Sequence, residues 1–250
     1  MNFCEFCDFT SSLSAWASRL VLKTSSNSLS RWAKKDGTIV TDLDITIEEK
    51  FRKEISLKYP THSIRGEELA NLEKESDYCW VLDPLDGTFN YSLGIPFYGI
   101  LIGLLYKGKP NFGSCRLPVY ENAFIAGDGQ NCTINGQNHK DLNFSRLHTS
   151  LVLTTDESRI RTSKYAKSWS ELQKCGSTFR TWGDCFGYYM VLTGKADLML
   201  DLDLKDCDIL PLIPIMKAAG LSVIMLQPGT YSDVIVCKPE LRKEIEKIFF

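Results

Sequence analysis

The chain has 250 residues, of which 44% are hydrophobic and 24% charged, and its net charge is −2 at pH 7. This composition is typical of a globular protein with a large core, and the charge gives no basic footprint for nucleic acid or an anionic membrane. No run of about 18 apolar residues argues for a membrane span, and the acidic N-terminus does not resemble a signal peptide. The nine cysteines are odd in number and scattered, so we expect reduced thiols in a cytoplasmic protein.

The N-terminal part of the chain predicts helices followed by antiparallel hairpins. Apolar residues recur on one side of residues 10–24 and again at Ile47, Phe51 and Ile55, which is the period of an amphipathic helix. Further along, apolar runs alternate with Gly-containing turns, as in hairpins. The predicted features are a turn at Asp36-Gly37, a strand at Val81-Leu82, two strands joined at Lys107-Gly108, and two more joined at Gly127-Asp128-Gly129.

From residue 149 onward, strand and helix alternate. The predicted strands are 151–156, 177–182, 196–202, 221–226 and 233–237, and the predicted helices are 158–174, 185–194, 209–220 and 238–250. This change of pattern indicates an N-terminal α+β half, residues 1–145, and a C-terminal α/β half, residues 146–250. No flexible linker separates them, so we expect an extended interface with a site between the halves.

Two carboxylates end the strand in WVLDPLDGTFNY, at Asp83 and Asp86, and Gly87 and Thr88 follow at once. Mg²⁺ prefers oxygen ligands and is often held by a few carboxylates. The backbone N–H groups of Gly87-Thr88 suit an anion if a helix or turn begins there. A plain loop is the alternative, because Asp-Pro and Asp-Gly are common turn pairs.

More acids stand near other predicted element ends. Glu67 lies in a GEE stretch shortly before the strand, and DLDLKDCD packs four aspartates into eight residues where a helix begins. Acids so close repel each other unless they are solvated or share a cation. Asp208 in that stretch could equally be a helix cap, and so could Asp44 at the start of the Ile47 helix.

With these pieces in order, the sequence resembles the inositol monophosphatase superfamily of Mg²⁺-dependent phosphomonoesterases from about residue 10 to about residue 225. The pieces are VTDLD (40–44), GEE (66–68), LDPLDGTFN (82–90) and DILPLIPIMKAAG (208–220). Two stretches are most similar to the histidinol-phosphate phosphatase branch, RTWGDCFGY (180–188) and LKDCDILPLIP (204–214). Phe89-Asn90 after DGT is nearer to the inositol-phosphate branch, and Cys207 stands where the family commonly has an aromatic residue.

The resemblance implies the layered αβαβα sandwich of the inositol monophosphatase and fructose-1,6-bisphosphatase type, with the active site between the halves. It also implies two or three Mg²⁺ ions. Glu67, Asp83 and the backbone carbonyl of Leu85 would hold one ion, and Asp83, Asp86 and Asp208 would hold the second. Glu67 could also reach a third, weaker ion.

The resemblance further implies the roles of the remaining site residues. Thr88, with Asp44 behind it, would orient and help deprotonate the attacking water. The amides of Gly87 and Thr88 would hold the phosphate. The residues on the side of the leaving group would be Asp184, Cys185, Asp201 and a supporting Arg180.

The expected substrate is a small phosphorylated alcohol, attacked in line by metal-activated water. Histidinol phosphate, a substrate of histidine biosynthesis, comes first because two anionic side chains suit its amine and imidazole. A myo-inositol monophosphate comes second, and a sugar phosphate or 3′-phosphonucleotide third. A catalytically inactive regulatory relative is a distant alternative. No nucleic acid or membrane partner is expected, and a homodimer is, because family members commonly dimerise.

Overall fold

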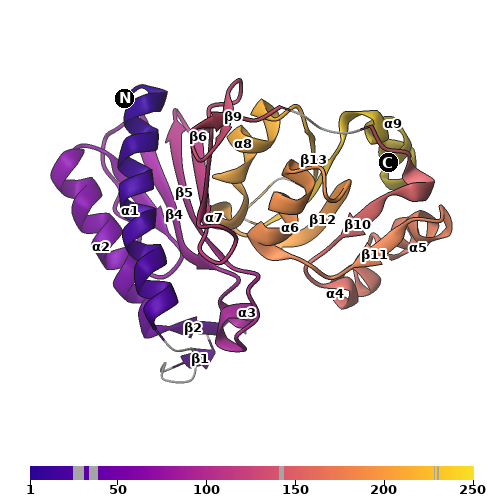
Figure 1. Ribbon diagram of the computed structural model, residues 1–250, viewed down its shortest axis with the longest axis horizontal. Coiled ribbons are helices and arrows are strands. Elements are labelled where there is room, and N and C mark those ends of the chain that lie inside the picture. Colours follow the sequence, from indigo (N-terminus) through magenta and orange to yellow (C-terminus); the bar gives the residue numbers. More distant parts are fainter. Residues whose placement is uncertain (25–30, 34–38, 141–143, 228, 230) are drawn as a thin grey trace.

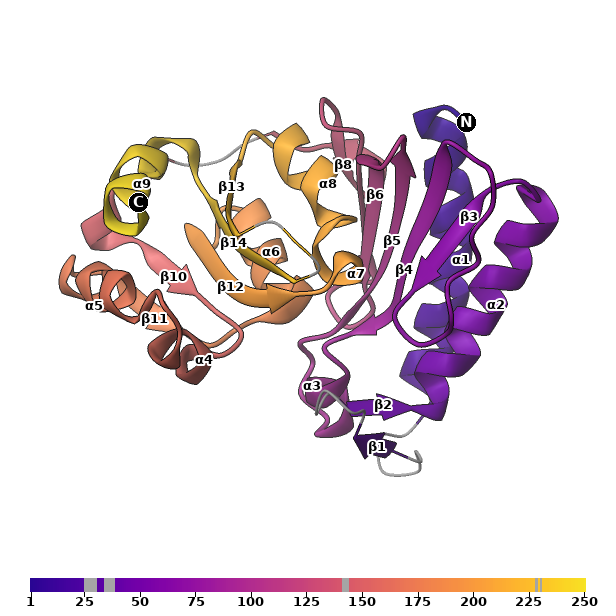
Figure 2. The same ribbon diagram turned by 180° about the vertical axis from the view of Figure 1, so that it is seen from behind.

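The computed structural model describes residues 1–24, 31–33, 39–140, 144–227, 229 and 231–250. Five layers stack across the molecule, as Figures 1 and 2 show from opposite sides: two helices, a seven-stranded sheet, a central layer of helices, a five-stranded sheet and outer helices. The predicted αβαβα sandwich is therefore confirmed. The predicted turn at Asp36-Gly37 lies outside the described residues.

The N-terminal layers are two long helices and the seven-stranded sheet that they cover. The helices are α1 (Phe3–Lys23) and α2 (Asp42–Lys58). The strands are β3 (Ser63–Gly66), β4 (Tyr78–Asp86), β5 (Gly99–Tyr106), β6 (Lys109–Leu117), β7 (Ala123–Gly127), β8 (Cys132–Ile134) and β9 (Gln137–Asn138), paired in chain order. A small hairpin, β1 (Arg31–Ala33) and β2 (Ile39–Thr41), precedes α2.

The remaining layers come from the C-terminal part of the chain. The central layer holds α6 (Asp184–Leu192), α7 (Asp206–Ile209) and α8 (Leu212–Ala218). The five-stranded sheet has the order β11-β10-β12-β14-β13, built from β10 (Leu151–Leu153), β11 (Thr178–Arg180), β12 (Leu198–Leu204), β13 (Ser222–Gln227) and β14 (Ser232–Cys237). The outer helices are α4 (Glu157–Thr162), α5 (Ala166–Lys174) and α9 (Arg242–Phe249). Among the described helices, none is both long and apolar enough to cross a bilayer.

Three predicted helices differ from the observed ones for local reasons. The first helix begins at Phe3 instead of residue 10, because Asn2 and Glu5 form a reciprocal capping box. The predicted helix 158–174 is split, because the Ser163 hydroxyl accepts from the Tyr165 N–H and so competes with the helical backbone bonds. The predicted helix 209–220 breaks at Pro211, which has no N–H to donate.

Glycines on the seven-stranded sheet let the central helices approach it closely. A Cβ at Gly113 would lie 1.7 Å from the carbonyl oxygen of Pro211, and one at Gly127 would lie 2.5 Å from the Cα of Ile215. Any side chain at these two positions would push α8 and the Pro211 turn off the sheet. Glycine therefore lets a C-terminal helical layer sit directly on the N-terminal sheet and brings Asp208 of α7 toward β4. The division into residues 1–145 and 146–250 stays a prediction.

Candidate active site

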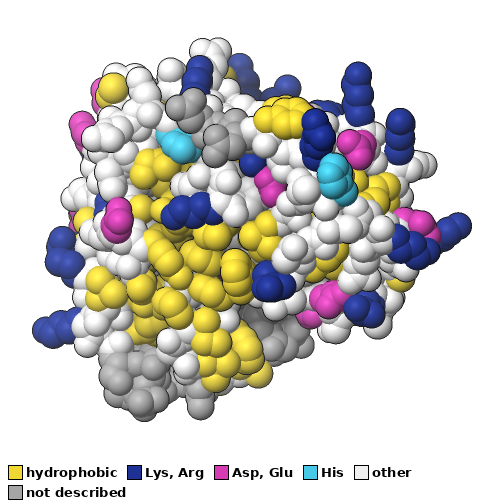
Figure 3. All heavy atoms as spheres, turned by 45° about the vertical axis from the view of Figure 1, so that its right-hand side comes forward, with side chains coloured by type: hydrophobic (Ala, Val, Ile, Leu, Met, Phe, Trp, Pro, Cys, Tyr) yellow, Lys and Arg dark blue, Asp and Glu magenta, His cyan; other side chains and the backbone are white. Residues whose placement is uncertain are grey.

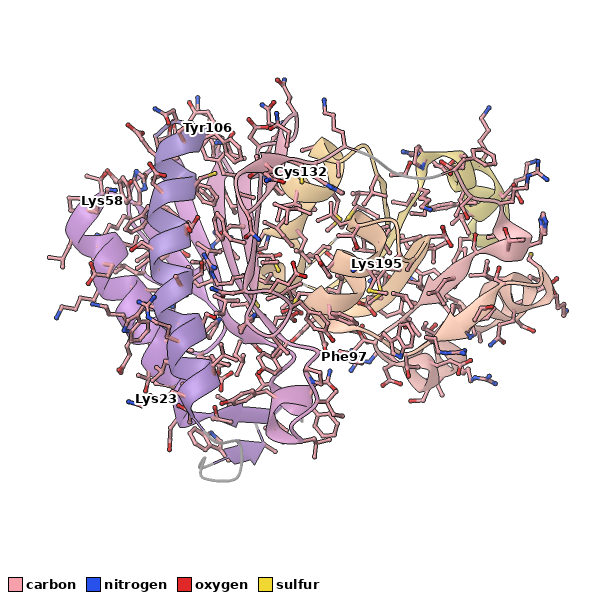
Figure 4. The ribbon with its side chains drawn as sticks, viewed as in Figure 1. Lys23, Lys58, Phe97, Tyr106, Cys132 and Lys195 are labelled. Carbon is pink, nitrogen blue, oxygen red and sulfur yellow. The ribbon has the colours of Figure 1, made fainter. Side chains whose placement is uncertain are left out.

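A cavity of about 580 Å³ lies between the halves, as expected from the sequence. It is lined by the end of β4, the start of α3 (Thr88–Ser92), the loop after β10, the start of α6 and the end of β12. Near this junction the Phe97 ring, labelled in Figure 4, stacks on Phe186 of α6 with centroids 4.4 Å apart. That contact helps to hold the start of α6 against the N-terminal half. The predicted site residues that line the cavity are Glu67, Asp83, Leu85, Asp86, Gly87, Thr88, Asp184, Cys185, Asp201 and Asp208.

The turn after β4 aims the hydroxyl of Thr88 at Asp44. Gly87 has φ +84°, and a Cβ there would lie 2.4 Å from the carbonyl oxygen of Phe97, so this turn requires glycine. Thr88 Oγ1 lies 2.9 Å from Asp44 Oδ1 and 2.8 Å from the Leu85 carbonyl oxygen. A threonine hydroxyl carries one proton, so it can donate to only one of them at a time.

Asp44 caps a helix and also contacts Thr88, so the helix cap and the contact with Thr88 that the sequence suggested are both present. Its Oδ2 accepts from the N–H of Thr41, at 2.9 Å, and from the Thr41 hydroxyl, which completes the capping box of α2. Its Oδ1 faces Thr88. Burial raises the pKa of Asp44, while the hydrogen bonds from Thr41 and Thr88 oppose that shift.

Acids from three separate parts of the chain converge in the wall of the same cavity. Glu67 follows β3, Asp83 ends the regular part of β4, and Asp208 lies in α7 beside Cys207. One ligand atom from each of these four residues lies within 4.8 Å of the others. Such convergence on a cavity wall, with carboxylate oxygens in the majority, fits a hard divalent cation.

The electrostatics of this acidic cluster favour a cation. Burial raises the pKa of Asp83 well above its usual range, and repulsion from Glu67, Asp86 and Asp208 raises it further. Burial and the nearby Glu67 raise the pKa of Asp208 to about 7. These carboxyls therefore resist ionisation unless positive charge is placed among them. The donor set of the described residues fits Mg²⁺.

One positive side chain contacts this cluster, and sequence reasoning missed it. Lys205 Nζ lies 3.1 Å from Glu67 Oε1, and its backbone N–H donates to Asp208 Oδ2 at 2.8 Å. Asp86 is not among the four residues that converge within 4.8 Å: its Oδ2 accepts from the backbone N–H of Cys185 at the start of α6, although its charge still raises the pKa of Asp83. Lys205 could have been suspected from its place within DLDLKDCD.

The leaving-group side holds the buried acid Asp201 and the half-buried acid Asp184, each met by hydrogen-bond donors. Asp201 is 2% exposed, and it accepts from the Thr155 N–H at 2.9 Å and from the Thr155 hydroxyl at 3.0 Å. Asp184 Oδ2 accepts from Asn90 Nδ2 at 2.6 Å. Burial raises the pKa of Asp201 to about 7 and that of Asp184 to about 6, despite these bonds.

The backbone of Asp184 is strained, with φ +51° at the first residue of α6. A non-glycine residue in this region is uncommon, and such strain often marks a functional position. Its N–H donates to the Thr155 hydroxyl at 3.0 Å, which links it to Asp201. Sequence reasoning missed the role of Thr155, although its place directly after β10, at a strand end, was a usable signal.

Arg180 lies apart from the other predicted site residues. It belongs to β11, is exposed, and donates from Nη1 to the carbonyl oxygen of its neighbour Phe179 at 2.7 Å. It does not line the cavity, and its supporting role stays a prediction. Arg159 is the guanidinium that does line the cavity, 4.0 Å from Asp156 and 3.8 Å from Asp203.

Known proteins match this chain over most of its length. A sequence model described as "Inositol monophosphatase family" matches residues 5–247. The chain is similar to Bifunctional phosphatase IMPL2, chloroplastic, of Arabidopsis thaliana, with 33% identity over 75% of this chain and 54% of that protein. It is also similar to Histidinol-phosphatase of Chlorobaculum parvum, with 30% identity over 77% and 74%. The match thus spans about half the length of the first relative and three quarters of the second.

Two further comparisons bear on function and on fold. Nus factor SuhB of Pasteurella multocida is 29% identical over 85% of this chain and 82% of that protein. A solved structure described as an IMPase/NADP phosphatase complexed with Mg²⁺ and phosphate superposes with a TM-score of 0.83 at 17% identity, over 98% of this chain and 95% of that one. At that identity the superposition shows the shared fold.

Proposed function

The chain belongs to the inositol monophosphatase family, and from that premise we propose that it is a Mg²⁺-dependent phosphatase of a small phosphorylated alcohol. The observation that carries the proposal is the pairing of two features in one cavity. The acids of the cluster, of which Asp83 is buried and Glu67 and Asp208 are half-buried, line it together with Thr88, which is backed by Asp44. Metal-assisted phosphoester hydrolysis needs both features, a cation site and a group that positions water.

Two or three Mg²⁺ ions are proposed for the cluster. Glu67, Asp83 and the carbonyl of Leu85 would hold one, Asp83, Asp86 and Asp208 the second, and Glu67 could reach a third. When bound, Mg²⁺ supplies positive charge for the phosphate and the leaving oxygen and lowers the pKa of water. A relative of this fold was solved with Mg²⁺ and phosphate, which supports this choice of metal.

The residues of this chain position the water and the phosphate. Thr88 Oγ1 accepts a hydrogen bond from the water while its own proton points to Asp44 Oδ1, which aims a water lone pair into the cavity. Asp44 is itself held by Thr41 on its other oxygen, which fixes the carboxylate oxygen that the Thr88 hydroxyl faces. The backbone N–H groups of Gly87 and Thr88 face the phosphate.

Histidinol phosphate is our proposed substrate. Asp184 and Asp201 bring two acids to the leaving-group side, where they suit a cationic amine, and a histidinol-phosphatase is among the relatives. A myo-inositol monophosphate is the second candidate. It is favoured by Asn90, because Phe89-Asn90 after the DGT motif is nearer to the inositol-phosphate branch than to the histidinol-phosphate branch. Asn90 also donates a hydrogen bond to one oxygen of Asp184. The first substrate would place the protein in histidine biosynthesis.

We also propose a cytoplasmic homodimer. Figure 3 shows hydrophobic side chains gathered on one face of the molecule, with basic and acidic side chains around them. Phe89, Leu93 and Val119 are among the exposed large hydrophobic residues. A broad apolar face on a globular protein is typical of a protein–protein interface, and a second copy is the simplest partner.

A regulatory role without turnover is the alternative function. The relative named Nus factor SuhB supports keeping it, although all of the predicted metal ligands and both Thr88 and Asp44 are present here. Phosphate release separates the two functions directly. An inactive relative releases no phosphate from any substrate, whatever its fold.

The decisive experiment measures phosphate release with Mg²⁺ from histidinol phosphate and myo-inositol 1-phosphate in parallel. Asp83→Asn is the control, because it removes one charge from the cluster at constant volume. Release from histidinol phosphate that this substitution abolishes is the expected result. A preference for inositol phosphate would move the substrate to the second candidate, and no release from either would favour the regulatory function.

A further inference from the structure

One buried polar group that faces the cavity is incompletely satisfied within the described structure. Tyr188 lies one turn into α6 from Asp184, lines the cavity, and is 2% exposed. Its hydroxyl is fully buried and lies beside the Asp201 carboxylate, but it forms no hydrogen bond of normal geometry with any described residue. A buried hydroxyl without a partner is costly, so such a group in a cavity wall points to a ligand that completes it.

The surroundings of Tyr188 indicate which kind of ligand this is. Asp201 is the charged neighbour, and both of its oxygens are held in place by Thr155, through an N–H and a hydroxyl. Burial, and then the charge of Asp201, raise the pKa of Tyr188 well above its usual range, so the phenol is neutral. A neutral oxygen and a carboxylate side by side offer two acceptors and one negative charge, which matches an ammonium group better than an uncharged alcohol.

We propose that Tyr188 determines specificity by holding, together with Asp201, an ammonium group on the leaving alcohol. The phenol oxygen accepts one N–H of the ammonium, and Asp201 supplies the opposite charge. This inference rests on the proposed function and specifies the substrate class: phosphorylated alcohols whose alcohol part carries an ammonium group. A polyol could also donate to Tyr188, but it brings no positive charge to Asp201, whose present partners from Thr155 are neutral.

The chain offers a matched control in a second tyrosine. Tyr165, at the boundary of α4 and α5 in the outer layer, also has a buried hydroxyl that lies beside a carboxylate, that of Asp233, and forms no hydrogen bond of normal geometry with any described residue. It lies outside the cavity lining. Tyr188→Phe and Tyr165→Phe each delete one such oxygen, but only the first changes the cavity, and melting temperatures of both variants report any effect on the fold.

The test compares these two variants by kinetics and by direct binding of L-histidinol in calorimetry. For Tyr188→Phe we expect the KM for histidinol phosphate and the Kd for histidinol to rise about tenfold or more, the effect of losing a hydrogen bond to a charged group. The kcat should change little, and the KM for myo-inositol 1-phosphate should stay at the wild-type value. Tyr165→Phe should leave all of these constants unchanged.

Three results would overturn the proposal: a Tyr188→Phe protein with wild-type affinity for histidinol, equal losses on both substrates, or a lowered melting temperature with unchanged KM. The last would mean that the hydroxyl serves the fold, for instance through a bound water. Because calorimetry needs no turnover, it measures the effect of Tyr188→Phe on the Kd for histidinol even if the protein hydrolyses neither substrate. Failure of the proposed function and failure of this inference are therefore distinguishable.

Discussion

Two groups of acids face the same cavity, and they differ in what surrounds them. On the leaving-group side, Asp201 and Asp184 accept hydrogen bonds from Thr155 and Asn90, which are neutral donors. In the cluster, Asp83 accepts one backbone N–H, from Leu85, Lys205 contacts Glu67 and Asp208, and the neighbouring carboxylates repel one another. One group is held by neutral donors, and the other combines mutual repulsion with contact to one positive side chain.

This difference separates two tasks, substrate selection and metal binding, which cannot be told apart from the acidic residues in the sequence alone. A carboxylate held by neutral donors keeps its geometry in the free protein and can select a substrate. Carboxylates that repel each other are stabilised most by a bound cation, so they suit a metal ion. The predictions that follow test this contrast, from the largest expected effect to the smallest.

Removing charge from the cluster should have the largest effect on activity. We expect Asp83→Asn to lower phosphate release by about a thousandfold, corresponding to several kcal/mol of lost metal-dependent stabilisation. The fold should survive, because the substitution relieves repulsion in a buried site. Phosphate release and circular dichroism check this. Substantial residual turnover would remove Asp83 from the metal centre.

Thr88→Ala should act on turnover far more than on substrate affinity. The water would lose its orienting acceptor, and we expect kcat to fall on the order of a hundredfold or more, as for a lost acid–base group, with little change in KM. Steady-state kinetics measure the split. Thr88→Ser is the matched control, because it keeps the hydroxyl, and it should retain most of the activity. A rise in KM alone would contradict the proposed role.

The metal-free protein should lose stability as pH rises. The pKa values of Asp83 and Asp208 are raised in the folded protein, so above about pH 4 the folded chain holds protons that the unfolded chain has released. The free energy of unfolding should therefore fall from about pH 4 to the folded pKa, about 7 for Asp208. Melting curves in a chelator at several pH values measure it.

Added Mg²⁺ should stabilise the protein more at the upper end of this pH range, because binding needs ionised carboxylates. Saturation at a hundred times Kd contributes about 2.7 kcal/mol. Asp83→Asn should flatten both the pH slope and the Mg²⁺ effect. A wild-type melting temperature that neither depends on pH nor responds to Mg²⁺ would contradict the role given to the cluster.

Asp201→Asn should have the smallest effect of these and the most selective one. The amide keeps the shape of the side chain and loses the charge, so we expect the preference for histidinol phosphate over myo-inositol 1-phosphate to fall by about tenfold. The Mg²⁺ affinity should stay near the wild-type value. The ratio of kcat/KM values measures this change. An unaltered ranking of substrates would exclude Asp201 from substrate selection.

Local signals predicted the N-terminal side of the site better than the C-terminal side. Asp83, Asp86, Gly87 and Thr88 lie within one strand and the turn after it, so their spacing alone indicates a shared place. Thr155 carries only the weaker signal of its place after a strand, and Tyr188 carries none, because both come near Asp201 only when the strands and α6 pack together. Asn90 was noticed as a departure from a motif, and its contact with Asp184 spans the two halves.

The sequence by itself indicated the family through short motifs, and the resemblance then implied the layered fold and the residues of the proposed metal centre; apolar periodicity added only the order of helices and strands. The tertiary structure decided which acids are compensated by donors and which repel. That depends on how closely α7 and α8 approach the seven-stranded sheet, across Gly113 and Gly127, and on where α6 begins. Burial and the distance between charges set the pKa values, and both are properties of packing rather than of sequence order.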